Sequence, residues 1–276
     1  MEVRAFGIII NLNFENRIKH YTSHQKILLV GEGDFSFALC LARAFGSAIN
    51  MVATSLDSRE LLMVKYSKAM SNVKELKDRG CIVLHEVDVH RMSQHPFLSY
   101  FRFDRIIYNF PHAGYLRMNC PFSPEVNQLQ VLFHQDLVRG FFKNAREMLN
   151  GTGQIHVTHK TTFPFNEWKI VNLAEEVGLD LIHEEEFSIW DYPGYYNRKG
   201  VGMCDGSFPV WLSSTYMFAE PLYRKTRFHP GALSISTWSA EIVDMACTYL
   251  ESLEMKKSKR GRKAERVCST VLDPYY

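Results

Sequence analysis

The sequence predicts an α/β fold in which a mostly parallel sheet is covered by helices on both faces. Three observations support this prediction. Short apolar runs typical of buried strands alternate with longer amphipathic segments, and short turns connect them. The first apolar run leads into a glycine turn, "GEGD", which a helix-like segment follows. The last two apolar runs have no helix between them, so they should form an antiparallel pair.

The predicted elements alternate along the chain in an order that defines the topology. We predict strands at 26–30, 50–53, 81–85, 103–108, 154–159, 179–187 and 214–219, and helices at 35–45, 59–78, 124–150 and 166–177. Seven strands that end in an antiparallel pair match a Rossmann-like class I methyltransferase better than a dehydrogenase. Residues 188–213 then form an insertion between the last two strands.

Capping residues mark the ends of the predicted helices. Ser58 can cap the second helix. Ser123 and Pro124 mark the start of the longest helix, Glu125 suits its positive end, and Gly151 ends it. The expected buried face of this helix repeats at helical spacing and comprises Val126, Leu129, Leu132, Phe133, Leu137, Phe141, Ala145, Met148 and Leu149.

The composition indicates one sizeable globular core in a nearly neutral chain. The 276 residues are 46% hydrophobic and 22% charged, with a formal net charge of +2, so nucleic-acid contacts would need local basic patches. The six cysteines are scattered and form no CxxC pair, which indicates a reducing compartment without a disulfide framework or a zinc site. No apolar run approaches the roughly 20 residues of a membrane span. We therefore expect neither a membrane nor a metal as partner.

We divide the chain into three parts. Residues 1–19 form an N-terminal extension, residues 20–219 form the sheet domain, and residues 220–276 form a C-terminal extension. The last part contains an amphipathic helix at 238–255 and the basic run "KKSKRGRK", Lys256 to Lys263. Such a run can bind phosphate or act as a nuclear localisation signal, and a solvated tail is an equally good interpretation.

Polar groups at the strand ends outline a cleft for a ligand that contains a nucleoside. Gly31 and Gly33 let the backbone turn sharply and approach a ligand. Asp57 ends the second strand, where it can accept hydrogen bonds from ribose hydroxyls, and Asp88 ends the third strand, where an adenine amine could donate to it. This arrangement fits NAD and S-adenosylmethionine equally well.

The two carboxylates of the glycine turn favour one of these two ligands over the other. Glu32 and Asp34 would face the pyrophosphate of NAD, and the third glycine of G-x-G-x-x-G is Ser36, so the dinucleotide pattern is incomplete. S-adenosylmethionine has no phosphate, and its sulfonium and ammonium groups are positively charged. We therefore predict S-adenosylmethionine as the ligand; the competing interpretation is a plain strand-to-helix turn with solvated aspartates.

The loop after the fourth strand, "YNFPHAG", carries the predicted catalytic residues. Asn109 offers both a donor and an acceptor for a base edge, and Pro111 fixes the backbone. Phe110 or Tyr115 could stack on a flipped base, and His112 could move a proton. The order Asn-Phe-Pro-His is similar to the Asn-Pro-Pro-aromatic motif of enzymes that methylate base nitrogens. The alternative is a capped turn with a surface histidine.

Three segments together resemble one protein family. "ILLVGEGDFSFALCLA", "ATSLDS" and "IIYNFPHAG", in that order and spacing, closely resemble the Bmt-five-like domain of large-subunit ribosomal RNA uridine-N3 methyltransferases and their plant relatives. The resemblance covers about residues 20–219. It implies a Rossmann-like methyltransferase fold, S-adenosylmethionine as donor, and rRNA uridine as substrate. Residues 31–34 correspond to the donor loop and residues 109–112 to the motif beside the target base, whereas residues 1–13 and 222–276 match nothing in the family.

Methylation of uracil N3 requires removal of its proton before the lone pair can attack. His112 is our candidate base, because a histidine ordinarily titrates near neutrality, and Asp34 is the second candidate. Asn109 could donate to a uracil carbonyl and stabilise the negative charge that deprotonation places there. Alignment of nucleophile and methyl group, with exclusion of water, supplies the rest of the catalysis.

The insertion "WDYPGYYNRKGVG" mixes aromatic and basic residues, as RNA-binding loops do. Aromatic rings stack on bases and cations contact phosphates. The predicted RNA contacts are Lys160, Tyr192, Tyr195, Tyr196, Arg198 and Lys199. A packed aromatic plug is the competing interpretation of this segment.

Two other functions compete with an RNA base methyltransferase. A non-catalytic RNA-binding or ribosome-assembly module on the same fold would keep a basic aromatic face but would not need an intact donor pocket. A small-molecule methyltransferase fits less well, because the insertion is both aromatic and basic. The predicted partner is ribosomal RNA or a pre-ribosome, and the predicted location is the nucleus and nucleolus, with the cytoplasm as the alternative.

Overall fold

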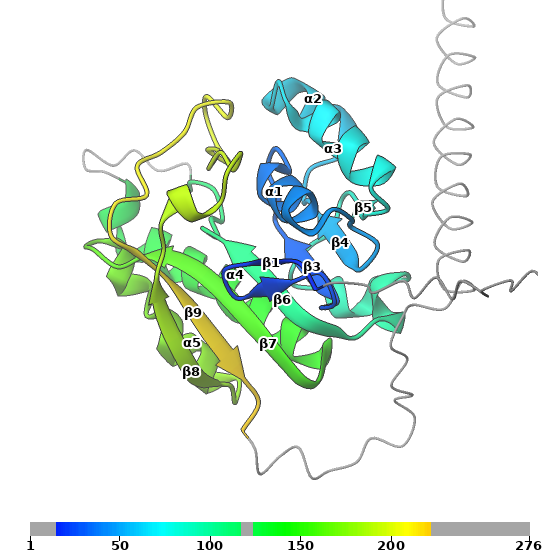
Figure 1. Ribbon diagram of the computed structural model, residues 1–276. Coiled ribbons are helices and arrows are strands. Elements are labelled where there is room, and N and C mark those ends of the chain that lie inside the picture. Colours follow the sequence, from blue (N-terminus) through cyan, green and yellow to red (C-terminus); the bar gives the residue numbers. More distant parts are fainter. Residues whose placement is uncertain (1–14, 117–123, 222–276) are drawn as a thin grey trace, which may run out of the picture.

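The computed structural model describes residues 15–116 and 124–221 (Figure 1). The helix expected at 238–255 and the basic run Lys256 to Lys263 lie outside these residues, as does Ser123. Within them, no helix combines the length and the apolar character that a bilayer crossing requires.

The described residues form a seven-stranded sheet with the strand order β5-β4-β3-β6-β7-β9-β8. Its strands are β3 Ile27–Val30, β4 Met51–Thr54, β5 Ile82–Leu84, β6 Phe103–Asn109, β7 Leu149–Lys160, β8 Asp180–Glu186 and β9 Ser213–Ala219. The strands from β5 to β7 are parallel to one another, and β9 runs antiparallel to both β7 and β8. The predicted class I methyltransferase topology, with its antiparallel last pair, is confirmed.

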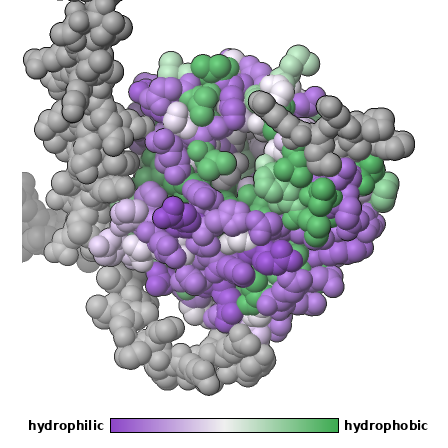
Figure 2. Space-filling model, turned by 180° about the vertical axis from the view of Figure 1, so that it is seen from behind, coloured by the Kyte–Doolittle hydropathy of each residue, from purple (hydrophilic) through white to green (hydrophobic). Residues whose placement is uncertain are grey.

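Helices cover both faces of the sheet and bury alternate residues of the strands. On β3, Leu28 and Val30 belong to one hydrophobic core with α4 (Gln128–Glu147) and α5 (Ile170–Glu176), while Ile27 and Leu29 belong to the other. The second core is formed with α1 Ser36–Phe45, α2 Arg59–Lys65 and α3 Ala69–Asp78, which Figure 1 shows grouped together beside β4. The surface seen from behind is mainly hydrophilic and is interrupted by apolar patches (Figure 2).

Two predicted helices are divided in the structure. The single helix expected at 59–78 is wrong, because Tyr66 takes an extended conformation and ends α2 before α3 begins. Tyr66 is buried there, and its hydroxyl donates to the carbonyl of Lys199 at 3.2 Å. The helix expected at 166–177 is replaced by the 3-10 turn η4 (Phe165–Trp168) and α5.

The longest helix begins and ends at other residues than predicted. The side chain of Asn127 caps α4, accepting from the backbone N–H of Leu129 at 2.9 Å, after the 3-10 turn η3 (Pro124–Val126). The helix ends at Glu147, and Gly151 lies within β7 instead of ending the helix.

The first turns of α4 also bury a different face than the apolar spacing predicts. Leu129, Leu132 and Phe133 remain 41–56% exposed, whereas the polar residues Gln130 and His134 are buried. Both of these polar side chains bind the loop that follows β6. From Val138 onward the predicted face is buried, including Phe141, Ala145 and Met148.

A short hairpin at the start of the described residues was not predicted. It pairs β1 (Arg17–Ile18) with β2 (Tyr21–Thr22). Tyr21 is buried, and its hydroxyl lies 3.2 Å from Nδ1 of His156 on β7. Since the hairpin crosses the boundary expected at residue 19, we propose that the sheet domain starts before Arg17.

The two faces of α4 give a test of this packing. Phe141→Ala should lower the free energy of unfolding by about 3–5 kcal/mol, because it removes a fully buried ring from the core. Leu132→Ala, on the exposed side of the same helix, should change it by less than about 0.5 kcal/mol. Urea denaturation of both variants measures the difference, and equal losses would contradict the described orientation of α4.

Candidate active site

A cavity lies where the carboxyl ends of β3 and β6 meet. Its lining comes from the glycine turn, from the end of β6 and its loop, and from the insertion between β8 and β9. Of the predicted site residues, the cavity brings together Gly31, Glu32, Gly33, Asp34, Asn109, Phe110, His112, Tyr195, Tyr196 and Arg198. The other predicted residues are not part of its lining: Asp57, Asp88, Pro111, Tyr115, Lys160, Tyr192 and Lys199.

The glycine turn is held between two tyrosine side chains. Gly31 has a φ of +68°, and a Cβ at this position would overlap the ring of Tyr108. A Cβ on Gly33 would lie 3.3 Å from the hydroxyl of Tyr66, which is a tight contact. Gly31 therefore needs glycine for both conformation and packing, whereas a side chain at Gly33 would require a small shift of Tyr66.

The two carboxylates of the turn are in different states. Asp34 accepts from the backbone N–H of Ser36 at 2.9 Å and pairs with Nε of Arg198 at 2.7 Å. Glu32 accepts from the backbone N–H of Ala38 at 3.3 Å and has no cationic partner among residues 15–116 and 124–221. Burial raises the pKa of Glu32 to about 8, and the neighbouring charge of Asp34 adds to this. Glu32 is therefore mainly protonated at neutral pH, which corrects the expectation of two free negative charges.

Asn109 at the end of β6 presents an unsatisfied amide to the cavity. Its side-chain oxygen and nitrogen are both buried and have no hydrogen-bond partner within the described part of the chain. Leaving a buried polar group unpaired costs roughly 1–3 kcal/mol, so a bound ligand that pairs with it would recover this cost. Asn109 is thus the residue in the cavity most clearly arranged to bind something.

Phe110, predicted to stack on a base, packs inside the protein. Its ring contacts Phe187 and Phe208 edge to face, with centroids 5.5 and 5.3 Å apart. These contacts join the loop after β6 to both ends of the insertion.

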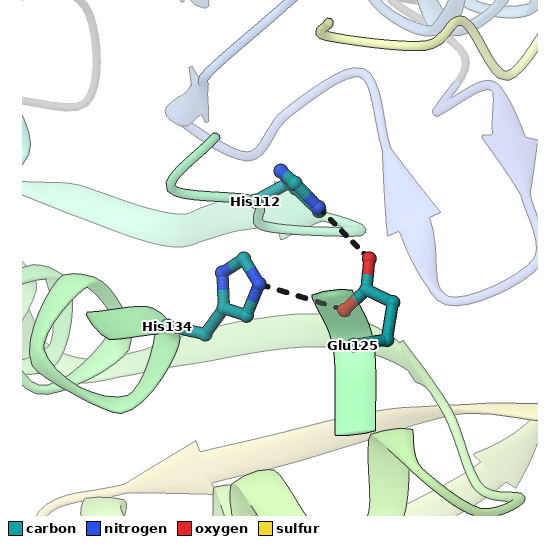
Figure 3. Close-up of side chains that lie close together, drawn as sticks. All are labelled: His112, Glu125 and His134. Carbon is teal, nitrogen blue, oxygen red and sulfur yellow. Dashed lines mark hydrogen bonds and ion pairs between the residues drawn. The ribbon is translucent and has the colours of Figure 1, made fainter. Parts of the chain in front are cut away.

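His112 takes part in a cluster with Glu125 of η3 and His134 of α4 (Figure 3). Its Nε2 lies 3.1 Å from one oxygen of Glu125, and Nε2 of His134 lies 3.5 Å from the other. The hydroxyl of Tyr115 also donates to Glu125, at 3.0 Å. Burial by itself raises the pKa of Glu125, but the hydrogen bond with His112 and the nearby ring nitrogen of His134 outweigh it and hold this pKa below its ordinary value.

The backbone fixes the protonation of His112. The N–H of Gly114 donates to its Nδ1 at 3.0 Å, so this nitrogen is unprotonated and the proton of the neutral ring lies on Nε2, facing Glu125. The ligand atoms of His112, Glu125 and His134 lie within 4.8 Å of one another, a spacing that could hold a metal ion. A metal on Nε2 of His112 would have to displace this proton, so the hydrogen bonds favour a proton-sharing cluster.

Sequence reasoning missed Glu125 and His134 as site residues. Glu125 was assigned to a helix end, and His134 fell outside the expected apolar face. One feature of the sequence indicates this site: Gln130 and His134 are polar residues four apart, on one face of the first turns of an otherwise amphipathic helix.

The insertion covers the glycine turn and does not form an open aromatic loop. Tyr192 is 3% exposed and stacks on Phe187, and Tyr195 packs against Phe37 with a centroid distance of 5.1 Å. The competing interpretation, a packed aromatic plug, therefore describes these two rings better than an open RNA-binding loop, and their contact with RNA stays a prediction. Tyr196 is 61% exposed, and Lys199 is exposed beside it.

Three more predicted residues have partners within the protein. Asp57 binds Nζ of Lys65 with both oxygens, at 2.7 and 2.9 Å, and Asp88 accepts from the backbone N–H of His90 at 2.9 Å. Lys160 lies over the rings of Phe165 and Phe208, where burial lowers its pKa. Contacts of Asp57 and Asp88 with a nucleoside stay predictions.

Comparison with known proteins gives one family and several relatives. The BMT5-like family, described as rRNA (uridine-N3-)-methyltransferase BTM5-like, matches residues 28–199. An uncharacterized protein of Arabidopsis thaliana is 51% identical over 75% of this chain and 98% of its own length. Heavy metal-associated isoprenylated plant protein 41 of the same plant is 46% identical over 73% of this chain, which spans 38% of that relative. The 25S rRNA (uridine(2634)-N(3))-methyltransferase of Saccharomyces cerevisiae is 23% identical over 71% of this chain and 72% of its own length.

The state of Glu32 predicts a pH-dependent stability. Its pKa rises from an ordinary 4.5 to about 8 on folding, so the unfolded chain loses this proton more readily and folding weakens as pH rises through that window. Glu32→Gln removes the titration, and its stability relative to the original chain should increase by roughly 2–4 kcal/mol between pH 5 and pH 8. Urea denaturation at several pH values measures this difference. Parallel stability curves for the two proteins would mean that Glu32 is already ionised in the folded state.

Proposed function

Since the chain belongs to the BMT5-like family, we propose that it is an S-adenosylmethionine-dependent methyltransferase that methylates N3 of a uridine in large-subunit ribosomal RNA. The observation that carries the proposal is the cavity itself, in which the donor turn and the Asn109 to His112 motif of the matched region meet. The function named for the yeast relative supports the choice of uridine N3 as the target.

The residues of the cavity suit this methyl donor. The glycine turn offers close backbone approach without a side chain at Gly31 or Gly33, and the unpaired amide of Asn109 offers a donor and an acceptor. A ligand phosphate at this turn would have to compete with Asp34 and Glu32 for the N–H groups at the start of α1, which disfavours NAD. When bound, S-adenosylmethionine supplies an electrophilic methyl group beside these residues.

We propose that Asn109 and His112 act on the target base. Asn109 donates from its amide nitrogen to a uracil carbonyl and so stabilises the anion formed when N3 loses its proton. His112 accepts that proton at Nδ1, once the base replaces the N–H of Gly114 there, while Glu125 stabilises the resulting imidazolium through Nε2–H. Asp34 suits the role of base less well, since Arg198 already pairs with it.

Partners and location follow from this activity. We propose rRNA or a pre-ribosome as the partner, with exposed Tyr196 and Lys199 at the edge of the cavity as RNA contacts. Nuclear or nucleolar localisation, with the cytoplasm as the alternative, stays a prediction that imaging of a fluorescent fusion would test.

The purified chain should form 3-methyluridine in large-subunit rRNA when S-adenosylmethionine is present. Asn109→Ala should lower the rate about 100-fold, in line with losing one preorganised donor to a developing anion. Nucleoside mass spectrometry of single-turnover reactions measures both. Asn172→Ala, an exposed asparagine on α5, is the matched control and should keep the full rate. RNA binding without donor binding or methylation would favour the non-catalytic module instead.

Replacement of His112 should give a deficit that depends on pH. His112→Ala removes the base, but alkaline buffer deprotonates uracil without help, so the deficit should shrink as pH rises. Glu125→Gln should show a smaller deficit with the same trend, because it removes the partner of the imidazolium and leaves the ring in place. A pH–rate profile of the single-turnover reaction tests this, and a deficit constant across pH would assign His112 to positioning the base.

A further inference from the structure

Arg198 lines the cavity with a mostly buried side chain. Among the described residues it is the one lysine or arginine in the lining, and its side chain is 17% exposed. Its Nε pairs with Asp34 at 2.7 Å and its Nη1 donates to the carbonyl of Asp205. Its Nη2 makes no hydrogen bond with the residues that the structure describes, so one donor group of the guanidinium remains available.

The insertion is fastened to the glycine turn on both sides of Arg198. The hydroxyl of Ser36 donates to the carbonyl of Tyr196 at 3.1 Å and accepts from its N–H at 3.0 Å. Tyr66 donates to the carbonyl of Lys199 at 3.2 Å, and Asp205 accepts from the N–H of Ser67 at 3.1 Å. These contacts join α1 and the link between α2 and α3 to the segment that carries Arg198, so its guanidinium is held in place beside the turn.

The positive end of α1 is already used by the protein's own carboxylates. The N–H of Ser36 donates to Asp34, and the N–H of Ala38 donates to Glu32. A ligand carboxylate at this turn would therefore compete with two internal carboxylates for the helix terminus. Arg198 is the positive group left in the cavity for such a ligand.

We infer that Arg198 binds the carboxylate of the donor's methionine moiety, and that Asp34 is the positioning residue that holds its guanidinium. This inference rests on the proposed function and deepens it, because the amino-acid end of the donor carries both a carboxylate and an ammonium group. Arg198 and the acidic turn then provide one charge of each sign for the two groups. The assignment replaces the prediction that Arg198 contacts RNA phosphate.

Calorimetry of the full chain with two ligands tests the inference. The ligands are S-adenosylhomocysteine and its decarboxylated analogue, which lacks the carboxylate alone. Arg198→Ala should weaken binding of S-adenosylhomocysteine by about 10- to 100-fold, as expected for a charge-assisted hydrogen bond. It should leave binding of the decarboxylated analogue within about twofold, because this ligand lacks the carboxylate that Arg198 binds.

Two further variants protect the test from a folding defect. Asp34→Asn combined with Arg198→Gln removes both charges, so that no buried carboxylate is left unpaired. Both ligands keep the ammonium group, so both should bind more weakly to this variant, but S-adenosylhomocysteine should lose about 10-fold more affinity than the decarboxylated analogue. Arg139→Ala, which breaks the Nε–carboxylate pair of Arg139 and Glu176 at 2.8 Å outside the cavity, should bind both ligands like the original chain.

The possible failures are distinguishable. Equal weakening of both ligands by Arg198→Ala would overturn the inference and make Arg198 a structural residue, and so would unchanged binding of both. Failure of the original chain to bind S-adenosylhomocysteine or S-adenosylmethionine at all would overturn the proposed function itself.

Discussion

Asp34 lies at the start of α1 with 3% of its surface exposed, in a place where an unpaired carboxylate would be costly. Arg198, which is 164 residues further along the chain, pairs with this carboxylate. The insertion between β8 and β9 must therefore lie over the glycine turn, and its aromatic residues fill the space against α1. The burial of Tyr192 and the partial burial of Tyr195 follow from this arrangement.

The cluster of His112, Glu125 and His134 fixes the opposite wall of the cavity, the loop after β6, in a similar way. The loop after β6 contains His112, Ala113 and Gly114, whose polar groups need partners away from water. The first turns of α4 supply them, which explains why Gln130 and His134 face inward while neighbouring leucines remain exposed. The loop after β6 is thus held by side chains, which is why polar residues take the buried positions in the first turns of α4.

Much of the fold could be predicted from the sequence, because local patterns determine it. Short apolar runs mark most of the strands, and the absence of a helix between the last two strands gives the antiparallel ending. The glycine turn and Asn109 could be placed in one cavity, since the carboxyl ends of parallel strands share an edge. The break at Tyr66 and the partner of Asp34 depend on contacts between distant segments, for which the sequence contains no local signal. For the cluster around Glu125, the polar pair Gln130 and His134 is the signal that the sequence offers.

The glycine turn shows why residue types alone do not predict the charge of the site. Two acidic residues next to a glycine turn suggest a site with two negative charges, but in the folded chain burial protonates Glu32 and Arg198 compensates Asp34. The cavity is then close to neutral, with a positive and a negative group fixed side by side and one carboxyl group that can still ionise. Such a site suits a ligand whose own charges are mixed, and it would neither attract a simple cation strongly nor accept a phosphate. Electrostatic selection of the donor therefore comes from the arrangement of charges, and only the fold brings that arrangement together.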